Sequence, residues 1–251
     1  MSILGLEAHF PILIQKLYRD NSMCGRFSLL TYAEKLAERF NVQEVIDRPD
    51  PIYNIAPLQM VATVVQRETR QLVLMKWGLV PSWADDISIG NRLINARAES
   101  IATKPSFRAA FKKRRCLIIS DGFYEWQKVG KVKKPIHVRL KNREPFAFAG
   151  LYEYWNKTKS GKSLQTCTII TTSPNRLMKS IHHRMPVILR PEFEDKWLNP
   201  EAKAEELEAM LQPYPAEEME AFEISKYVNN PRNQGPECIQ PVDETIQTTL
   251  L

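Results

Sequence analysis

The sequence lacks any apolar run of the roughly 18–20 residues that a membrane-spanning helix needs. It has no internal repeat, no low-complexity tract and no Gly/Ser-rich linker. Cysteine is scarce, and the four residues of this type are scattered, at Cys24, Cys116, Cys167 and Cys238. Because no two of them are close in sequence, a disulfide framework and a zinc knuckle are disfavoured, and a reducing compartment is favoured.

The composition is otherwise that of an ordinary globular protein. Hydrophobic residues make up 43% and charged residues 25% of the 251 positions, which disfavours collagen-like, disordered and membrane classes. This length allows one large domain or two small ones, with a sizeable core. The net charge is +6, from 35 basic and 29 acidic residues. This modest excess is compatible with a polyanionic partner but does not require one.

Residues 1–22 differ in character from the rest of the chain. They contain two short apolar patches, but a secretory signal is disfavoured because Lys16 and Arg19 come late and polar residues interrupt the apolar stretch. Three interpretations stay open: a docked N-terminal helix, a propeptide, and upstream sequence ahead of a true start at Met23. We predict that residues 1–22 are a leader outside the fold, that 23–242 form a single domain, and that 243–251 are a frayed tail.

Segments rich in β-branched or aromatic residues predict six strands, at Met60–Val65, Leu72–Trp77, Cys116–Ser120, Ile136–Leu140, Phe146–Gly150 and Thr166–Thr171. Several intervals between them are short and contain turn residues, which favours hairpins over β-α-β crossovers. Helices are predicted at 31–40, with Thr31 as N-cap, and at Ser173–Ile181, Pro191–Leu198 and Glu201–Leu211. The predicted fold is therefore α+β, with a mainly antiparallel β-sheet or barrel core flanked by short helices.

The first candidate for chemistry is Cys24, in the segment MCGRF. An internal cysteine next to a glycine is usually a small buried hydrophobic residue. If Met23 were removed, however, Cys24 would carry both a thiol and an α-amine, with ordinary pKa values of about 8.5 and about 7.7–8.0. A 1,2-aminothiol can attack an aldehyde twice, first through the amine and then through the thiolate, to close a five-membered thiazolidine ring. The segment that precedes Cys24 therefore decides its chemistry.

Two further segments offer polar side chains in unusual settings. In INARAE, Asn95 can orient a hydroxyl or a nucleophile without acting as a base, and the guanidinium of Arg97 suits a phosphate; a surface turn with an ion pair is the alternative. In DGFYEW, Glu125 lies among aromatic residues. Burial there would suit a carboxyl group to proton transfer, whereas the alternative is an edge-strand glutamate that faces solvent.

The pair His182 and His183 in IHHRMP is the remaining acid–base candidate. Adjacent side chains on a regular element point in different directions, so a shared metal ion is not expected. One of the two histidines can act as an acid or base near neutral pH, and the other can be structural.

Aromatic loops and basic runs bear on possible partners. The loops YNIAP and WGLVPSW place Trp77 and Trp83 near prolines, and loop tryptophans suit stacking on unpaired bases; taken alone, Trp77 fits the end of a buried strand better. The basic residues 112–115 and the lysines between 128 and 134 are the strongest positive runs. A charge run is usually a solvated face, but these two could line one groove that follows a nucleic-acid backbone.

Taken together, seven segments resemble in order the motifs of the SRAP family, the SOS-response-associated peptidases or abasic-site processing proteins: MCGRF, YNIAP, WGLVPSW, INARAE, DGFYEW, IHHRMP and NNPRNQGPECIQPV. The resemblance extends from Met23 to about Val242. It implies a SRAP-like fold and covalent capture of abasic sites in single-stranded DNA, through a thiazolidine formed by an N-terminal cysteine.

The resemblance also implies roles for individual residues. Cys24 matches the nucleophile, and Asn95, Glu125 and His182 match the family's active-site asparagine, glutamate and histidine. The positions that match residues expected to hold the strand are Arg26, Asn54, Trp77, Trp83 and Arg97. We expect no metal and no small-molecule cofactor, because aldehyde condensation needs neither. The leader departs from the family pattern, since it would leave Cys24 with an amide in place of the amine.

Three functions compete at this point. The favoured one is a crosslinker of abasic sites in the DNA damage (SOS) response, with possible lyase-like behaviour. The second is a cysteine-type peptidase with Cys24 as nucleophile and His182 as base, which could cleave its own leader. The third is a non-covalent single-strand-binding module with a structural Cys24. We expect a compact monomer that does not associate with membranes, in the bacterial cytoplasm at the nucleoid.

Overall fold

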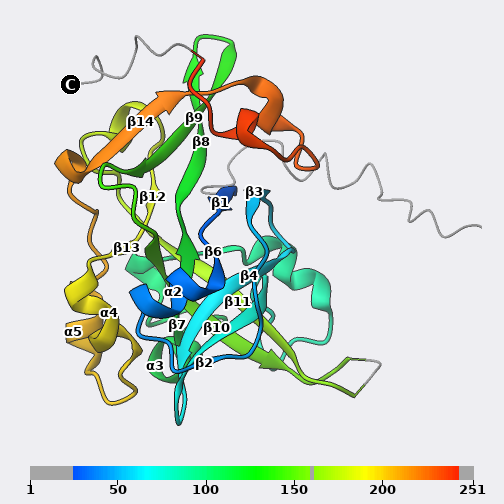
Figure 1. Cartoon of the computed structure of the whole chain (residues 1–251). Coiled ribbons are helices and arrows are strands. Elements are labelled where there is room, and N and C mark those ends of the chain that lie inside the picture. The colour runs from blue at the N-terminus through cyan, green and yellow to red at the C-terminus, as the bar shows by residue number, and fades with distance from the viewer. Residues whose placement is uncertain (1–24, 159–160, 243–251) are drawn as a thin grey trace, which may run out of the picture.

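The computed structural model of the chain describes residues 25–158 and 161–242 (Figure 1). Its strands form two sheets. The order of the first sheet is β14 (Met219–Glu223), β9 (Val132–Leu140), β8 (Gly122–Val129), β1 (Phe27–Leu29) and β3 (Ile52–Ile55). The order of the second sheet is β12 (Met185–Pro186), β11 (Leu164–Thr172), β10 (Phe146–Trp155), β7 (Arg115–Ser120), β4 (Met60–Gln66), β5 (Arg70–Trp77) and β2 (Glu44–Val45).

The second sheet closes into a five-stranded barrel. Its strands β11, β10, β7, β4 and β5 pair in that order, and β5 pairs back to β11 in parallel through Thr166↔Lys76 and Cys167↔Trp77. Two short strands attach to it: β13 (Ile188–Leu189) pairs with β10, and β6 (Asn95–Arg97) pairs with β11. Most of the pairings are antiparallel, so the prediction of a mainly antiparallel barrel core is confirmed.

The helices are short and lie outside the sheets (Figure 1). The α-helices are α2 (Ala33–Arg39), α3 (Arg108–Lys113), α4 (Pro191–Leu198) and α5 (Ala204–Ala209). The 3₁₀ turns are η1 (Ile87–Arg92), η2 (Ala98–Ser100), η3 (Met178–Ser180), η4 (Ala216–Glu218), η5 (Lys226–Asn229) and η6 (Pro236–Cys238). None of the helices in the described ranges combines the length and the apolar character needed to cross a membrane.

Aromatic packing joins the two sheets. The ring of Phe27 on β1 lies edge-on to two barrel side chains, with its centroid 5.1 Å from that of Trp77 and 5.7 Å from that of Phe148. Phe123 on β8 contacts Phe148 at 6.1 Å, and all four side chains are buried. Such edge-to-face pairs add about 0.5–1.5 kcal/mol each to the stabilisation from burial. The first sheet is thereby held against the barrel at the strands that carry the candidate site.

The structure confirms all six predicted strands and extends most of them, and it confirms the helix Pro191–Leu198. Two local predictions are wrong. The segment 173–181 forms only η3, because the side chain of Asn175 accepts a hydrogen bond from the Met178 amide at 2.8 Å and donates to the Tyr214 carbonyl at 2.7 Å. Thr31 is not the N-cap of α2: Tyr32 is, and the Thr31 hydroxyl instead donates to Asp121 at 2.8 Å.

Candidate functional site

Strand β8 buries the glutamate that the sequence singled out. Side chains alternate along a strand, and both faces of β8 are covered: Phe123 packs into the main core, and Tyr124 packs into a smaller cluster with Phe222 and Ile224. The Glu125 side chain, on the same face as Phe123, is 3% exposed. The alternative of a solvent-facing glutamate is therefore wrong. A buried carboxyl group adds little to apolar packing and can transfer protons, which makes this position a candidate for chemistry rather than for packing.

The start of β1 runs alongside Glu125. Phe27 pairs with Phe123 and Ser28 with Gly122, and the Tyr124 amide donates to the Arg26 carbonyl at 3.0 Å. This register leads the chain, read backwards from Phe27, towards the level of Glu125. Cys24 itself lies outside the described residues, as do the predicted leader and tail.

Arg26 is buried and held in one orientation. Its Nη1 donates to Asn54 Oδ1 at 2.7 Å and to the Val228 carbonyl at 2.9 Å, and its guanidinium carbon lies 5.6 Å from the centre of the Trp126 ring. Only 4% of the residue is exposed. The contacts of Arg26 therefore connect β1, β3 and the C-terminal loop 228–234.

Asn54 holds that C-terminal loop and is completely buried. Its Nδ2 donates to three carbonyls, of Val228 at 3.2 Å and of Asn230 and Asn233 at 3.0 Å each. The side chain of Gln234 bonds in turn to the Asn54 backbone, accepting from its amide at 3.2 Å and donating to its carbonyl at 3.3 Å. The expectation that Asn54 contacts a DNA strand directly is wrong in this conformation, since its side chain is fully occupied in positioning the loop and Arg26.

A second group of polar residues gathers around β6 and β11. Asn95 and Arg97 pair in register with Ile169 and Thr171, with Asn95 half-buried and Arg97 exposed. Arg184 donates through Nη2 to the Thr171 carbonyl at 2.6 Å and to Glu99 at 2.9 Å, and its Nη1 also bonds Glu99. The hydrogen bond from Arg184 lowers the pKa of the Glu99 carboxyl. The ion pair anticipated for INARAE is present, but Glu99 pairs with Arg184 rather than with Arg97.

The loop that carries His182 is attached to β8. The Gln127 side chain, two residues beyond Glu125, donates to the Ser180 carbonyl at 3.0 Å. His182 follows η3 and is half-buried, with Nδ1 3.2 Å from the backbone nitrogen and oxygen of Arg184. The His183 ring stacks at 4.3 Å on that of His182, and partial burial lowers the pKa of His183. Glu125 and His182 thus lie on segments that Gln127 connects directly.

The two tryptophans assigned to DNA binding differ completely in their exposure to solvent. Trp77 is 0% exposed, and its Nε1 donates to the Ile94 carbonyl at 2.8 Å. The expectation that Trp77 stacks on a base is therefore wrong; it fixes the backbone immediately before Asn95. Trp83 is 55% exposed and remains available for stacking.

The two basic runs do not line one groove. Arg115 is buried and donates to four backbone carbonyls, including those of Trp197 at 2.8 Å and Asn199 at 2.6 Å. Arg114 pairs with Glu153 at 2.5 Å. The exposed Lys112 and Lys113 lie on α3, at the opposite end of the molecule from the β8–β9 hairpin (Figure 1). The expectation that the two basic runs line one groove is therefore wrong.

His137 on β9 pairs with Tyr124 on β8. It is 3% exposed, its Nδ1 has no hydrogen-bond partner within the ranges that the structure describes, and its Nε2 is 3.5 Å from Ser28 Oγ. A Cβ on Gly122 would be 2.4 Å from that Nε2, so only glycine fits at this position of β8. Burial lowers the pKa of His137 to about 3.

The neutral state of His137 predicts a dependence of stability on pH. The unfolded chain takes up a proton near the ordinary value of 6.5, while the folded protein does not. Stability is therefore highest above pH 6.5 and falls as the pH decreases towards 3, by up to about 1.4 kcal/mol per pH unit from this group. Urea unfolding of wild type and His137→Gln between pH 4.5 and 7.5 measures this dependence of the free energy of unfolding on pH. We expect a shallower slope for the variant; identical slopes would contradict this account.

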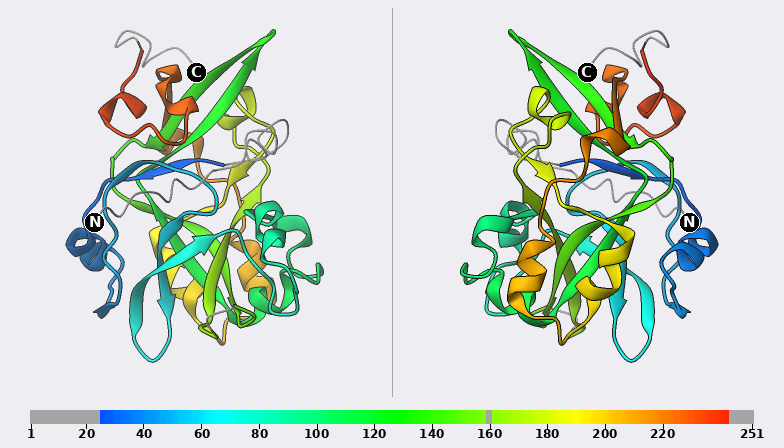
Figure 2. Two further views of the ribbon diagram at one scale, coloured as in Figure 1. Left: turned by 90° about the vertical axis from the view of Figure 1, so that its right-hand side faces the viewer. Right: turned by 90° about the vertical axis from the view of Figure 1, so that its left-hand side faces the viewer.

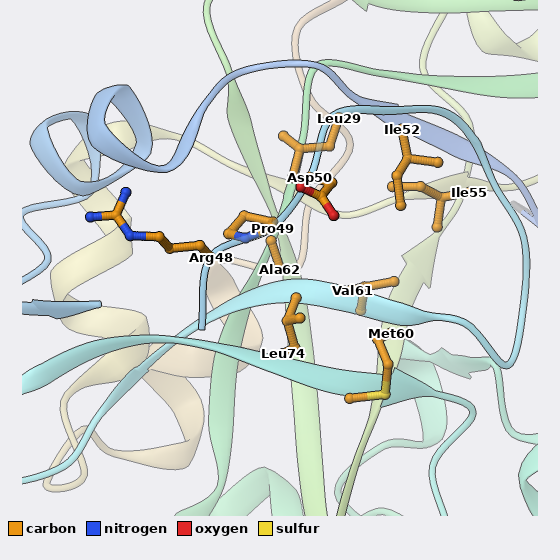
Figure 3. Close-up of a pocket in the computed structure, with 10 residues that line it drawn as sticks. All are labelled: Leu29, Arg48, Pro49, Asp50, Ile52, Ile55, Met60, Val61, Ala62 and Leu74. Atoms are coloured by element: carbon orange, nitrogen blue, oxygen red, sulfur yellow. The ribbon is translucent and has the colours of Figure 1, made fainter. Parts of the chain in front are cut away.

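The recess shown in Figure 3 is separate from these residues. It has a volume of about 130 Å³ and lies between β1, β3, β4 and β5. Apolar side chains such as Ile52, Val61 and Leu74 line most of it, and the Arg48 side chain extends away from it. No candidate site residue lines the recess, so it takes no part in the chemistry of the site. Within residues 25–158 and 161–242, no three His, Cys, Asp or Glu side chains gather as metal ligands would.

Sequence reasoning missed three residues that the structure connects to the candidate site: Gln127, Arg184 and Gln234. Each stands inside or directly beside one of the recognised segments. Their place in a motif was therefore the available signal. Their contacts were not predictable, because Gln234 bonds to a residue 180 positions away and Arg184 to one 85 positions away.

Comparison with known proteins identifies the family. The barrel fold and the ordered motifs define a single class of protein. The chain belongs to the SOS response associated peptidase (SRAP) family, whose model matches residues 23–231. The family prediction is thereby confirmed.

Individual relatives agree with this result. The chain is 47% identical over 223 residues to the abasic site processing protein YoqW of Bacillus subtilis, covering 87% of this chain and 99% of that one. It is 34% identical to the abasic site processing protein HMCES of Gallus gallus, covering 77% and 67%. A crystal structure of a protein from Bacteroides thetaiotaomicron superimposes with a TM-score of 0.80 at 32% identity, covering 88% and 100%.

Proposed function

We propose that this protein captures abasic sites in single-stranded DNA as a covalent thiazolidine and so protects the lesion in the DNA damage response. The relatives named above as abasic site processing proteins support it. The observation that carries it is the register of β1 on β8, which directs the chain from Phe27 back towards the buried Glu125. Cys24, three residues before Phe27, would then act beside this carboxylate.

The chemistry requires a free amine on Cys24, so the working chain begins at that residue. The amine nitrogen attacks the aldehyde carbon of the ring-opened deoxyribose, and water leaves to give an imine. The thiol sulfur then adds to the imine carbon, and its proton ends on the nitrogen, which closes the five-membered ring. No metal, cofactor or oxidant takes part in this balance.

Three side chains assist these steps. Glu125 takes a proton from the attacking amine and returns it to the leaving water. His182 protonates the ring oxygen of the sugar, which favours the open aldehyde, and Asn95 orients the amine or the sugar. Arg97 and Trp83, both exposed, contact the strand. The substrate places the protein at the nucleoid, in the bacterial cytoplasm.

The decisive experiment mixes the protein with a single-stranded oligonucleotide that carries one abasic site, followed by a denaturing gel. We expect a shifted band from protein whose intact mass begins at Cys24, and none from protein that retains Met1. Cys24→Ser keeps the amine but has no thiol, so we expect only an imine, visible after borohydride trapping and absent without it.

An abasic site reduced to the alcohol is the matched control, because it has the same shape but no aldehyde. A denaturation-resistant band with the reduced site, or an undiminished band with Cys24→Ser, would contradict the thiazolidine. Cleavage of unrelated peptides that depends on both Cys24 and His182 would favour a peptidase in its place.

A further inference from the structure

The strands β8 and β9 continue beyond the first sheet as a free-standing hairpin. Their pairing runs through Gln127↔Lys134 and Lys128↔Lys133 to Val129↔Val132 at the turn. The neighbouring strand β14 pairs with β9 only as far as Glu223↔Ile136. The outer part of the hairpin, residues 127–134, is therefore a two-stranded ribbon, and both views of Figure 2 show it projecting from the body of the protein.

This outer hairpin is basic throughout. It holds Lys128, Lys131, Lys133 and Lys134 and no acidic residue. Lys134 pairs with Glu223 at 2.7 Å, whereas Lys128 and Lys131 are exposed and have no ion-pair partner in the described part of the chain. Lys128 lies directly opposite Lys133, an arrangement of like charges that destabilises a strand pair. Within the described residues, the positive charges of Lys128 and Lys131 are therefore not balanced by an ion pair.

The hairpin is attached to the candidate site at its base. Glu125 precedes Lys128 by three positions on the same strand, a distance of about 10 Å at about 3.3 Å per residue. Gln127 bonds to the Ser180 carbonyl in the loop of His182, and Trp126 donates to Asn229 Oδ1 at 2.8 Å. The position of the lysines relative to Glu125 and His182 is therefore fixed by contacts on both faces of the ribbon.

We propose that the outer hairpin binds phosphate groups of the same single strand, on one side of the lesion, through Lys128 and Lys131. This inference rests on the proposed function for the position of the lesion, and on the hairpin's own charge and geometry for the contact. Exposed ammonium groups suit phosphates, and the apolar surface of the tip is limited to Val129 and Val132, each 49% exposed, which is little for a membrane or a protein partner.

The test compares two double variants that remove the same charge. Lys128→Gln/Lys131→Gln changes the hairpin, and Lys112→Gln/Lys113→Gln changes α3 at the far end of the molecule. Binding to an undamaged single strand of about 20 nucleotides is measured at several salt concentrations. Loss of two phosphate contacts lowers the slope of log affinity against log salt by about 1.4, which is about a 25-fold loss at 0.1 M salt. We expect this for the hairpin variant only.

A charge-conserving variant makes the outcome decisive. Lys128→Arg/Lys131→Arg keeps both positive charges and should bind as wild type does. Equal losses for the hairpin and α3 variants, or a wild-type salt slope for the hairpin variant, would overturn the proposal. Because undamaged DNA is the probe, absence of crosslinking by wild type would reject the proposed function without affecting this result.

Discussion

Replacement of Glu125 by glutamine is expected to slow crosslink formation by about 10²–10⁴-fold, the range that a positioned general acid–base contributes. Glutamine has nearly the same shape, so it fits the buried position on β8, but it cannot accept a proton from the amine. Single-turnover time courses on a single-stranded abasic oligonucleotide give the rate constant. Affinity for undamaged DNA should stay close to that of wild type, because the Glu125 side chain is buried.

A second buried glutamate provides the control. Glu153 on β10 is 5% exposed and pairs with Arg114, so Glu153→Gln also neutralises a buried carboxylate. That change should lower stability, since it leaves the Arg114 charge without its partner, but should leave the rate constant of crosslinking unchanged. A Glu125→Gln protein that crosslinks at the wild-type rate would show that another group, or solvent, carries the proton.

The sequence predicted the elements whose hydrophobic pattern is strong in itself. The barrel strands β4, β7 and β10 are nearly continuous apolar runs because most of their residues are buried on both faces. The helix Pro191–Leu198 has proline at its first turn, where a helix tolerates it. Strand β9 was predicted from Ile136 only, since the residues just before it are Lys133, Lys134 and Pro135. Those lysines are in a strand because β8 pairs with them across a two-residue turn, in which Gly130 has a φ of +59°, and composition does not report such pairing.

The candidate site likewise contains residues whose environment could be predicted from the sequence and residues whose environment could not. The burial of Glu125 was predictable from the aromatic residues around it and the alternation of a strand. The positions of Asn54 and Arg26 were not, because their partners lie in the loop 228–234, between 174 and 202 residues away. A motif match identifies such residues as important but does not separate those that contact the ligand from those that hold the backbone in place.

Trp77 and Trp83 give the most direct test of the distinction between residues that hold the backbone in place and residues that contact the DNA. Trp77→Ala is expected to reduce the free energy of unfolding by about 3–5 kcal/mol, the usual cost of truncating a buried aromatic side chain, since it also removes the bond to Ile94 and the contact with Phe27. Trp83→Ala should change stability by less than about 0.5 kcal/mol, as surface substitutions usually do. Denaturant unfolding with matched m-values measures both.

Binding to undamaged single-stranded DNA should show the opposite order. Loss of one base-stacking contact costs about 1–3 kcal/mol, so Trp83→Ala should weaken binding by roughly 5- to 150-fold while the protein stays folded. Trp77→Phe keeps a ring in the core and should bind DNA nearly as wild type does under conditions where it is folded. If Trp77→Phe lost affinity and Trp83→Ala did not, the exposed loop would have no part in holding the strand, and the contact would have to come from the segment before Asn95 after a rearrangement of the core.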